Sequence, residues 1–198
     1  RANLCEPEFC NKAQAGHEED IRPCIGCLRC LNGIMFGKRV ACTVNPSLEP
    51  ENEDTITPAK ETKNVLVIGG GPAGMEAAYV AAKRGHHVVL ADRQDSLGGT
   101  VRIAAVPIAK QDLTQLIKYQ AHKLEQAGVK VLLNTEVTLE TIQKDYPDYE
   151  VILCAGATPV VPQFMTQFKR LDDCGRRPLW KEVPGTQDCS HRRRLCRM

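Results

Sequence analysis

A glycine-rich loop directly after a short β-branched run constrains the fold of this chain more than any other feature. Residues 64–68 (NVLVI) have the pattern of a buried strand. Gly69, Gly71 and Gly74 follow and complete the spacing G-x-G-x-x-G, and Pro72 suits the first turn of a helix. A strand, a glycine turn and a helix in this order predict a loop that binds the phosphates of a dinucleotide. The alternative is a glycine turn without a ligand.

Each glycine of this loop has a distinct expected role. Gly69 permits the tight turn, Gly71 lets the backbone approach a pyrophosphate, and Gly74 lets the helix pack close to the strand. The first helical turn begins with Pro72 and Ala73, and its N–H groups offer partial positive charge to the phosphates. We therefore expect these five residues to contact the cofactor.

An acidic residue lies where such a site binds the ribose. Asp92 follows the predicted strand 87–91 and lies eighteen residues beyond Gly74, where a carboxylate can accept hydrogen bonds from ribose hydroxyls. Arg93 comes next, and an arginine at this place can bind the 2′-phosphate of NADP. We favour a solvated Arg93, because Asp92 would repel that phosphate, and keep it among the candidate cofactor-binding residues.

Two small-residue turns favour FAD as the dinucleotide. Gly98 and Gly99 follow the acidic residue at short range. Residues 151–157 (VILCAGA) form a strand pattern that runs into a turn containing Ala155 and Gly156. Both turns can bring backbone close to a long ligand that lies over the edge of the sheet, so these four residues join the predicted site.

Strand and helix patterns alternate through the middle of the chain. The alternation predicts an α/β fold, namely a Rossmann-like FAD/NAD(P)-binding parallel sheet, incomplete at its end, with helices on both faces. The expected strands are 64–68, 87–91, 129–133 and 149–154, and the expected helices are 72–84, 112–127 and a short one near 139–144. The expected parts of the chain are a cysteine-rich segment (1–45), a linker (46–63), a partial dinucleotide-binding domain (64–162) and a basic tail (163–198).

Four of the ten cysteines form a second motif, Cys24-x2-Cys27-x2-Cys30-x11-Cys42. Three closely spaced thiolates and a remote fourth can hold the corners of a [4Fe–4S] cluster. Zinc sites usually use two separated C-x-x-C pairs, so the spacing favours iron–sulfur, with zinc and unligated thiols as alternatives. Residues 1–45 contain few core residues, so we expect the metal to stabilise this segment as well as to carry electrons.

Composition argues against several other classes of protein. Aromatic residues make up only 5% and the formal net charge is +2, which disfavours a nucleic-acid partner. No apolar run reaches the length of a membrane span, and the first residues lack the apolar core of a signal peptide. Thiolate ligands imply a reducing interior, so a cytoplasmic location is expected. We interpret the basic tail as disordered, or as aberrant sequence after a truncation.

Together these motifs resemble the iron–sulfur flavoenzymes of the Old Yellow Enzyme group, which includes 2,4-dienoyl-CoA reductase, trimethylamine dehydrogenase, enoate reductases and NADH:flavin oxidoreductases. The residues that carry the resemblance are IRPCIGCLRCLNG (21–33), ACTVNP (41–46), VLVIGGGPAGMEAA (65–78), VVLADRQDSLGG (88–99) and CAGATPVVP (154–162). The resemblance implies cluster ligands at Cys24, Cys27, Cys30 and Cys42, and dinucleotide contacts at Gly69, Gly71, Gly74, Asp92 and Gly99.

The resemblance also implies a pathway for electrons. Family members have an FMN-binding barrel with the substrate site before the cluster segment, and electrons pass from NAD(P)H to FAD, the cluster, FMN and the substrate. Arg1 resembles the arginine that binds the FMN phosphate, so the chain is expected to begin within a longer parent enzyme. Nearly all of the barrel and the NAD(P) domain are missing, so this chain alone is expected to lack the substrate site, and no catalytic residue is assigned. The alternatives are a zinc-stabilised nucleotide-binding module and an inactive truncated product.

Overall fold

The computed structural model describes residues 2–48 and 56–157, and the described residues up to Gly156 belong to one compact unit. The predictions for Arg1, for the middle of the linker and for the basic tail (163–198) concern residues outside the described ranges. None of the described helices is both long enough and apolar enough to cross a membrane.

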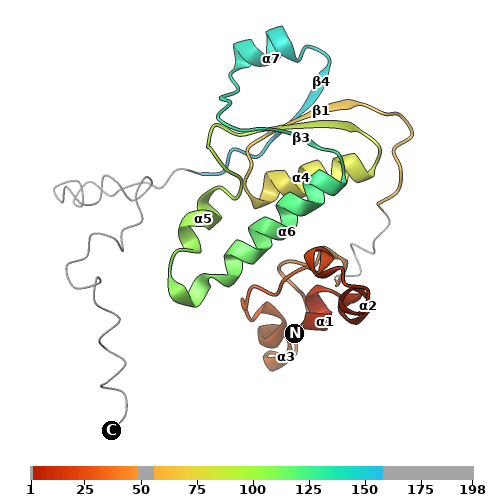
Figure 1. The fold of residues 1–198 in the computed structure, drawn as a ribbon, viewed down its shortest axis with the longest axis vertical. Coiled ribbons are helices and arrows are strands. Elements are labelled where there is room, and N and C mark those ends of the chain that lie inside the picture. Colours follow the sequence, from red (N-terminus) through yellow and green to blue (C-terminus); the bar gives the residue numbers. More distant parts are fainter. Residues whose placement is uncertain (1, 49–55, 158–198) are drawn as a thin grey trace, which may run out of the picture. The chain divides into compact units, whose positions relative to one another are not determined.

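A four-stranded parallel sheet lies at the centre of the unit (Figure 1) and confirms the predicted α/β class. Its strands are β1 (Asn64–Ile68), β2 (His87–Ala91), β3 (Lys130–Leu132) and β4 (Tyr149–Leu153), in the order β3-β2-β1-β4. β1 has a partner on each side, since Val67 pairs with Leu90 of β2 and with Ile152 of β4. Short aliphatic runs of this kind suit a parallel sheet that is covered on both faces.

Helices connect the strands along the chain. They are α4 (Pro72–Lys83), α5 (Thr100–Ala104), the 3-10 turn η4 (Ile108–Lys110), α6 (Asp112–Gln126) and α7 (Leu139–Asp145). The predicted ends of α4, α6 and α7 differ from the observed ends by one residue at most, whereas α5 and η4 were not predicted. Gly85 ends α4 two residues after Lys83 with φ +92°, a left-handed conformation that glycine adopts at little cost.

The side chains of the strands divide between two apolar layers. Val65, Val67 and Leu90 face one way and pack with Met75 and Ala78 of α4 and with Leu124 of α6. Leu66, Val89 and Ala91 face the other way and pack with residues on and near α7, including Ile142 and Tyr146. Figure 1 shows α4 and α6 on one face of the sheet and α7 on the other. This alternation between faces is the period-two pattern of a strand.

The N-terminal cysteine-rich segment, defined here as residues 2–48, consists of short helical pieces that were not predicted. They are α1 (Ala2–Cys5), α2 (Phe9–Gln14), the 3-10 turn η1 (Glu18–Asp20), α3 (Arg29–Met35) and the 3-10 turn η2 (Pro46–Leu48). Polar contacts join them: the Glu6 carboxylate accepts from the Lys12 ammonium at 2.7 Å. The Asn45 side chain, which is 1% exposed, donates to the Leu4 carbonyl at 3.0 Å.

Candidate functional site

The glycine-rich loop turns sharply between β1 and α4 and has no room for side chains at two positions. A Cβ on Gly69, whose φ is +113°, would lie 2.3 Å from the Cys154 carbonyl oxygen. A Cβ on Gly74 would lie 1.8 Å from the Gly69 carbonyl oxygen. Gly71 differs, because nothing lies within 4 Å of its Cβ position. The first two positions therefore need glycine for packing, whereas Gly71 leaves open space beside the backbone.

The first turn of α4 offers its backbone N–H groups to an anion. Gly71 is the residue that precedes the helix, no side chain caps the helix, and no acidic residue lies in its first turn. Pro72 occupies the first turn, where the missing N–H costs no intrahelical hydrogen bond. The N–H groups that follow, beginning with that of Ala73, add to the positive end of the helix dipole. This arrangement fits the pyrophosphate of a dinucleotide.

Asp92 lies immediately after β2, and both of its carboxylate oxygens are held by the backbone. The N–H of Gly70 donates to Oδ2, and the N–H of Gln94 donates to Oδ1 at 2.7 Å. Asp92 is only 9% exposed, so the carboxylate is fixed beside the glycine-rich loop. Arg93 is exposed on the next residue. The placement of Asp92 fits a hydrogen bond to ribose, and its charge disfavours a nearby 2′-phosphate.

The two small-residue turns lie against the same loop. The N–H of Gly98 donates to the Gly70 carbonyl at 2.8 Å, and a Cβ on Gly99 would lie 3.2 Å from the Gly71 Cα. A Cβ on Gly69 would meet the Ala155 nitrogen at 3.2 Å, and Gly156 follows with φ +71°. The predicted dinucleotide residues thus gather at the carboxyl ends of β1, β2 and β4, the edge at which α/β sheets bind ligands.

The four candidate cysteine ligands lie in one region, but they do not form a preorganised metal site. No three His, Cys, Asp or Glu residues in the described ranges are placed to share a metal ion. The seven described cysteines are all free thiols. Gly26 and Leu28 have φ values of +65° and +60°, so the backbone is in a left-handed conformation on both sides of Cys27. The thiol chemistry of the set fits a metal or cluster.

A fifth cysteine lies close to this set and was not singled out from the sequence. Cys5 is 2% exposed, and burial together with the nearby Cys24 and Cys42 raises its pKa to about 11. Within the set itself, the Cys27 sulfur lies 3.2 Å from the Thr43 hydroxyl oxygen. Cys5 has no motif spacing, so only the fold reveals that it is near the predicted ligands.

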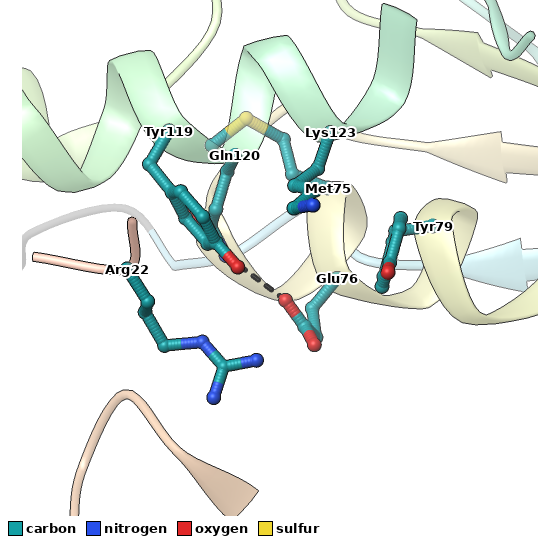
Figure 2. A pocket seen from close by; sticks show the side chains of 7 residues that line it. All are labelled: Arg22, Met75, Glu76, Tyr79, Tyr119, Gln120 and Lys123. Carbon is teal, nitrogen blue, oxygen red and sulfur yellow. Dashed lines mark hydrogen bonds between the residues drawn. The ribbon is translucent and has the colours of Figure 1, made fainter. Parts of the chain in front are cut away.

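A small pocket lies between the cysteine-rich segment and helices α4 and α6, and it was not predicted from the sequence. Figure 2 shows Arg22 entering from the segment, opposite side chains carried by the two helices. The guanidinium carbon of Arg22 lies 5.9 Å from the centre of the Tyr119 ring. Burial raises the pKa of Tyr119 above its usual value. The residues that line the pocket are Arg22, Met75, Glu76, Tyr79, Tyr119, Gln120 and Lys123.

Gln120 connects this pocket to the start of α4. Its side-chain amide donates to the Pro72 carbonyl at 3.3 Å and to the Glu76 carboxylate at 3.4 Å. Its Oε1 atom is buried without a protein partner among the described residues. A single polar residue of α6 therefore holds the turn of α4 that would face the phosphates.

Comparison with known sequences identifies the middle of the chain first. Residues 64–121 match the family described as FAD dependent oxidoreductase. Similar curated proteins include bilirubin reductase of Mediterraneibacter gnavus, 39% identical over 82% of this chain, and NADH oxidase of Thermoanaerobacter brockii, 40% identical over 82%. Cinnamate reductase of Clostridium sporogenes is 38% identical over 80%. The chain spans about a quarter of the length of these relatives (25%, 25% and 24%).

Solved structures agree with these matches. A 2-naphthoyl-CoA reductase in complex with 2-naphthoyl-CoA has a TM-score of 0.77 and 34% identity, over 82% of this chain and 25% of that protein. Histamine dehydrogenase from Rhizobium has a TM-score of 0.73 and 28% identity, over 81% of this chain and 24% of that protein. The resemblance seen in the sequence is thereby confirmed: this chain is a homologue of the iron–sulfur flavoenzymes of the Old Yellow Enzyme group, and it aligns with about a quarter of their length.

Proposed function

We propose that this chain is the electron-relay segment of an NAD(P)H-dependent iron–sulfur flavoprotein oxidoreductase of the enoate and 2,4-dienoyl-CoA reductase type. It would bind FAD at the glycine-rich loop and a [4Fe–4S] cluster at the four cysteines, and pass electrons toward FMN in a barrel of the parent enzyme. We call the glycine-rich loop with Asp92 and the two small-residue turns the dinucleotide cradle, and residues 24–42 with their four candidate ligands the cysteine window. The observation that carries this proposal is the presence of the dinucleotide cradle and the cysteine window in one compact unit.

The residues of the cradle would divide the work of binding FAD. Gly71 leaves space for the pyrophosphate, and the first turn of α4 supplies N–H groups to its oxygens. Asp92, held by the N–H groups of Gly70 and Gln94, would accept the ribose hydroxyls. Gly98 holds the second turn against the loop and leaves a smooth backbone surface. The flavin, when bound, supplies the exchange between two-electron and one-electron transfer.

The cysteine window would hold its cluster through thiolate sulfurs at Cys24, Cys27, Cys30 and Cys42. The left-handed residues Gly26 and Leu28 permit the tight turns that three cysteines at such short spacing require. Cys27 is favoured as a ligand because hydrogen bonds, the one with Thr43 foremost, outweigh burial and lower the pKa of its thiol. The cluster, when bound, supplies one-electron transfer.

The proposal also assigns partners and a compartment. Flavin and nicotinamide nucleotides and the barrel of the parent enzyme are the expected partners. A reducing compartment such as the cytoplasm suits free thiols at seven described positions. The organic substrate would bind in the barrel, so its chemistry is assigned to the parent enzyme and not to this chain.

An anaerobic reconstitution tests the proposal. The chain is incubated with iron, sulfide and FAD, desalted, and followed by absorption spectroscopy. We expect flavin bands and a broad sulfur-to-iron absorption that dithionite bleaches. Cys42→Ser should lose the broad absorption, whereas Cys10→Ser should keep it, because Cys10 is exposed and lies outside the window. A colourless protein that binds zinc at the same cysteines would favour the zinc-stabilised nucleotide-binding module instead.

A further inference from the structure

Helix α6 faces two carboxylates of the cysteine-rich segment: Nδ1 of His122 lies 3.9 Å from the exposed Glu19, and Asp20 makes the closer contacts. Oδ1 of Asp20, on η1, accepts from the Gln126 side-chain amide at 2.7 Å and lies 3.1 Å from Nε2 of His122. The Lys123 ammonium lies 3.7 Å from the same oxygen. The Gln126 hydrogen bond is the largest influence that lowers the pKa of Asp20. Three residues of α6 therefore converge on a single side chain of the segment.

Arg22 and Asn45, which flank the cysteine window in the sequence, are linked to this contact. Arg22 lies two residues after Asp20 and two before Cys24, and its guanidinium contacts Tyr119 of α6. The same guanidinium donates to the Asn45 side chain at 2.7 Å, and Asn45 lies three residues after Cys42. The two ends of the window are thus tied to each other and, through Arg22, to α6.

Other residues of α6 contact the dinucleotide cradle. Gln120 of α6 donates to the Pro72 carbonyl in the first turn of α4. Ile117 of α6 limits the other turn, because a Cβ on Gly98 would lie 2.7 Å from its Cδ1 atom. Helix α6 therefore contacts the cradle with one set of residues and the cysteine-rich segment with another.

We propose that Asp20 is a positioning residue: its contacts with Gln126, His122 and Lys123 fix the cysteine window on α6 and thereby set its separation from the dinucleotide cradle. This inference deepens the proposed function and rests on it for its consequence in electron transfer. The docking itself is a property of the chain without any bound group, so the two claims can fail separately.

Hydrogen exchange of the full chain without added cofactors tests the docking. Asp20→Ala should lower the protection of backbone amides in residues 2–48 by about tenfold, which corresponds to about 1.4 kcal/mol. Protection in β1 and β2 should not change. Glu18→Ala is the matched control, because Glu18 is an exposed carboxylate on the same 3-10 turn. Asp20→Asn keeps an oxygen for the Gln126 amide and should restore part of the loss.

A variant on the opposite side of the contact keeps the test decisive if Asp20→Ala fails to fold. Gln126→Ala should produce the same selective loss, and the double variant should lose less than the sum of the two single losses. Equal protection in Asp20→Ala and Glu18→Ala would overturn the proposal, as would a loss spread evenly over the sheet. In the chain loaded with FAD and cluster, Asp20→Ala should slow electron transfer between them without changing FAD affinity. Loss of selective protection without this slowing would overturn the electron-transfer consequence.

Discussion

The parallel sheet and the cysteine-rich segment lie in one compact unit but are stabilised by different interactions. In the sheet, Leu66, Val67 and Leu90 are fully buried between layers of helices. In the described part of the segment, the buried residues are Cys5, Glu6, Gly33 and Asn45, and only Cys5 among them is hydrophobic. Apolar burial gives the sheet its stability, whereas directed polar contacts organise the segment.

In keeping with this small apolar core, the segment has large apolar side chains that are exposed. Ile34, Met35 and Phe36 are 60%, 71% and 70% exposed at the end of α3. These exposed side chains do not contribute to a hydrophobic core within the segment. Such a segment depends on contacts with its neighbours, and α6 provides those contacts within this chain.

The largest expected effect separates packing from binding within the glycine-rich loop. Gly74→Val should destabilise the chain by at least about 4 kcal/mol, because the new side chain collides with the Gly69 carbonyl. Gly71→Ala should fold normally, since nothing occupies its Cβ position, but should weaken FAD binding by at least about tenfold. Urea unfolding and a fluorescence titration with FAD measure the two quantities. A Gly74→Val chain that unfolds like the unchanged chain would contradict the packing argument.

A pair of leucine truncations compares the two regions directly. Leu66→Ala should cost about 2–5 kcal/mol, because it leaves a cavity at a fully buried site between β2 and β4. Leu31→Ala on α3, where the side chain is 46% exposed, should change the free energy of unfolding by no more than about 0.5 kcal/mol. Urea unfolding followed by circular dichroism measures both. Similar losses in the two variants would show that the segment has an apolar core after all.

Acid should weaken the segment before the sheet. Burial alone would raise the pKa of Glu6, but the hydrogen bonds from Lys12 and from the Arg22 N–H lower it below its usual value of 4.5. A lowered pKa in the folded state means that the stabilisation is present above about pH 4.5 and is lost as the pH falls through the folded-state pKa. Glu6→Gln should remove about 1–3 kcal/mol of the segment's protection at pH 7.

Hydrogen exchange at several pH values, corrected for intrinsic rates, measures this effect. In the unchanged chain the amides of residues 2–48 should lose protection on acidification, and in Glu6→Gln that loss should be smaller. Glu18→Gln serves as the control because its carboxylate is exposed. An unchanged pH profile in Glu6→Gln would rule out Glu6 as the source of the acid sensitivity.

The smallest effect concerns thiol reactivity within the segment. Cys5 is buried and its pKa is raised to about 11, so its reactive thiolate is scarce at pH 8. Cys10 is exposed on α2, five residues away. Iodoacetamide should therefore label Cys10 well before Cys5, and peptide mass spectrometry reads the order. Urea should remove the difference, and equal labelling rates in the folded chain would show that Cys5 is not shielded.

The sheet could be predicted because each strand can be recognised from its own short sequence pattern. β1 and β2 are mainly aliphatic, β1 is followed directly by Gly69, and Gly69, Gly71 and Gly74 fix the start of α4. The short helices of the segment were not predicted, because four to seven residues show little helical period and no strand patterns flank them. The seven-residue α7 was predicted because it lies between two strand patterns in the alternating part of the chain. α3 even begins after Leu28 in a left-handed conformation, which no propensity favours.

The candidate site follows the same division. The candidate dinucleotide residues were predicted from spacing, because the chemistry of phosphate binding requires glycine at fixed intervals. The contact between Asp20 and Gln126 joins residues 106 positions apart, and neither residue belongs to a motif. Gln120 lies on the apolar side of α6, where the helical pattern predicts a hydrophobic residue. Long-range polar contacts of this kind are visible only when the fold is known.

The double role of α6 has a consequence for protein engineering. In the sequence, the linker between the segment and the sheet is the obvious place to join the segment to another domain in a chimaeric protein. A graft that joins residues 1–63 to a foreign dinucleotide domain would nevertheless separate Asp20 and Arg22 from Gln126 and Tyr119. The unit that has to be transferred is therefore discontinuous in sequence. It includes the cysteine-rich segment and the residues of α6 that contact η1 and Arg22.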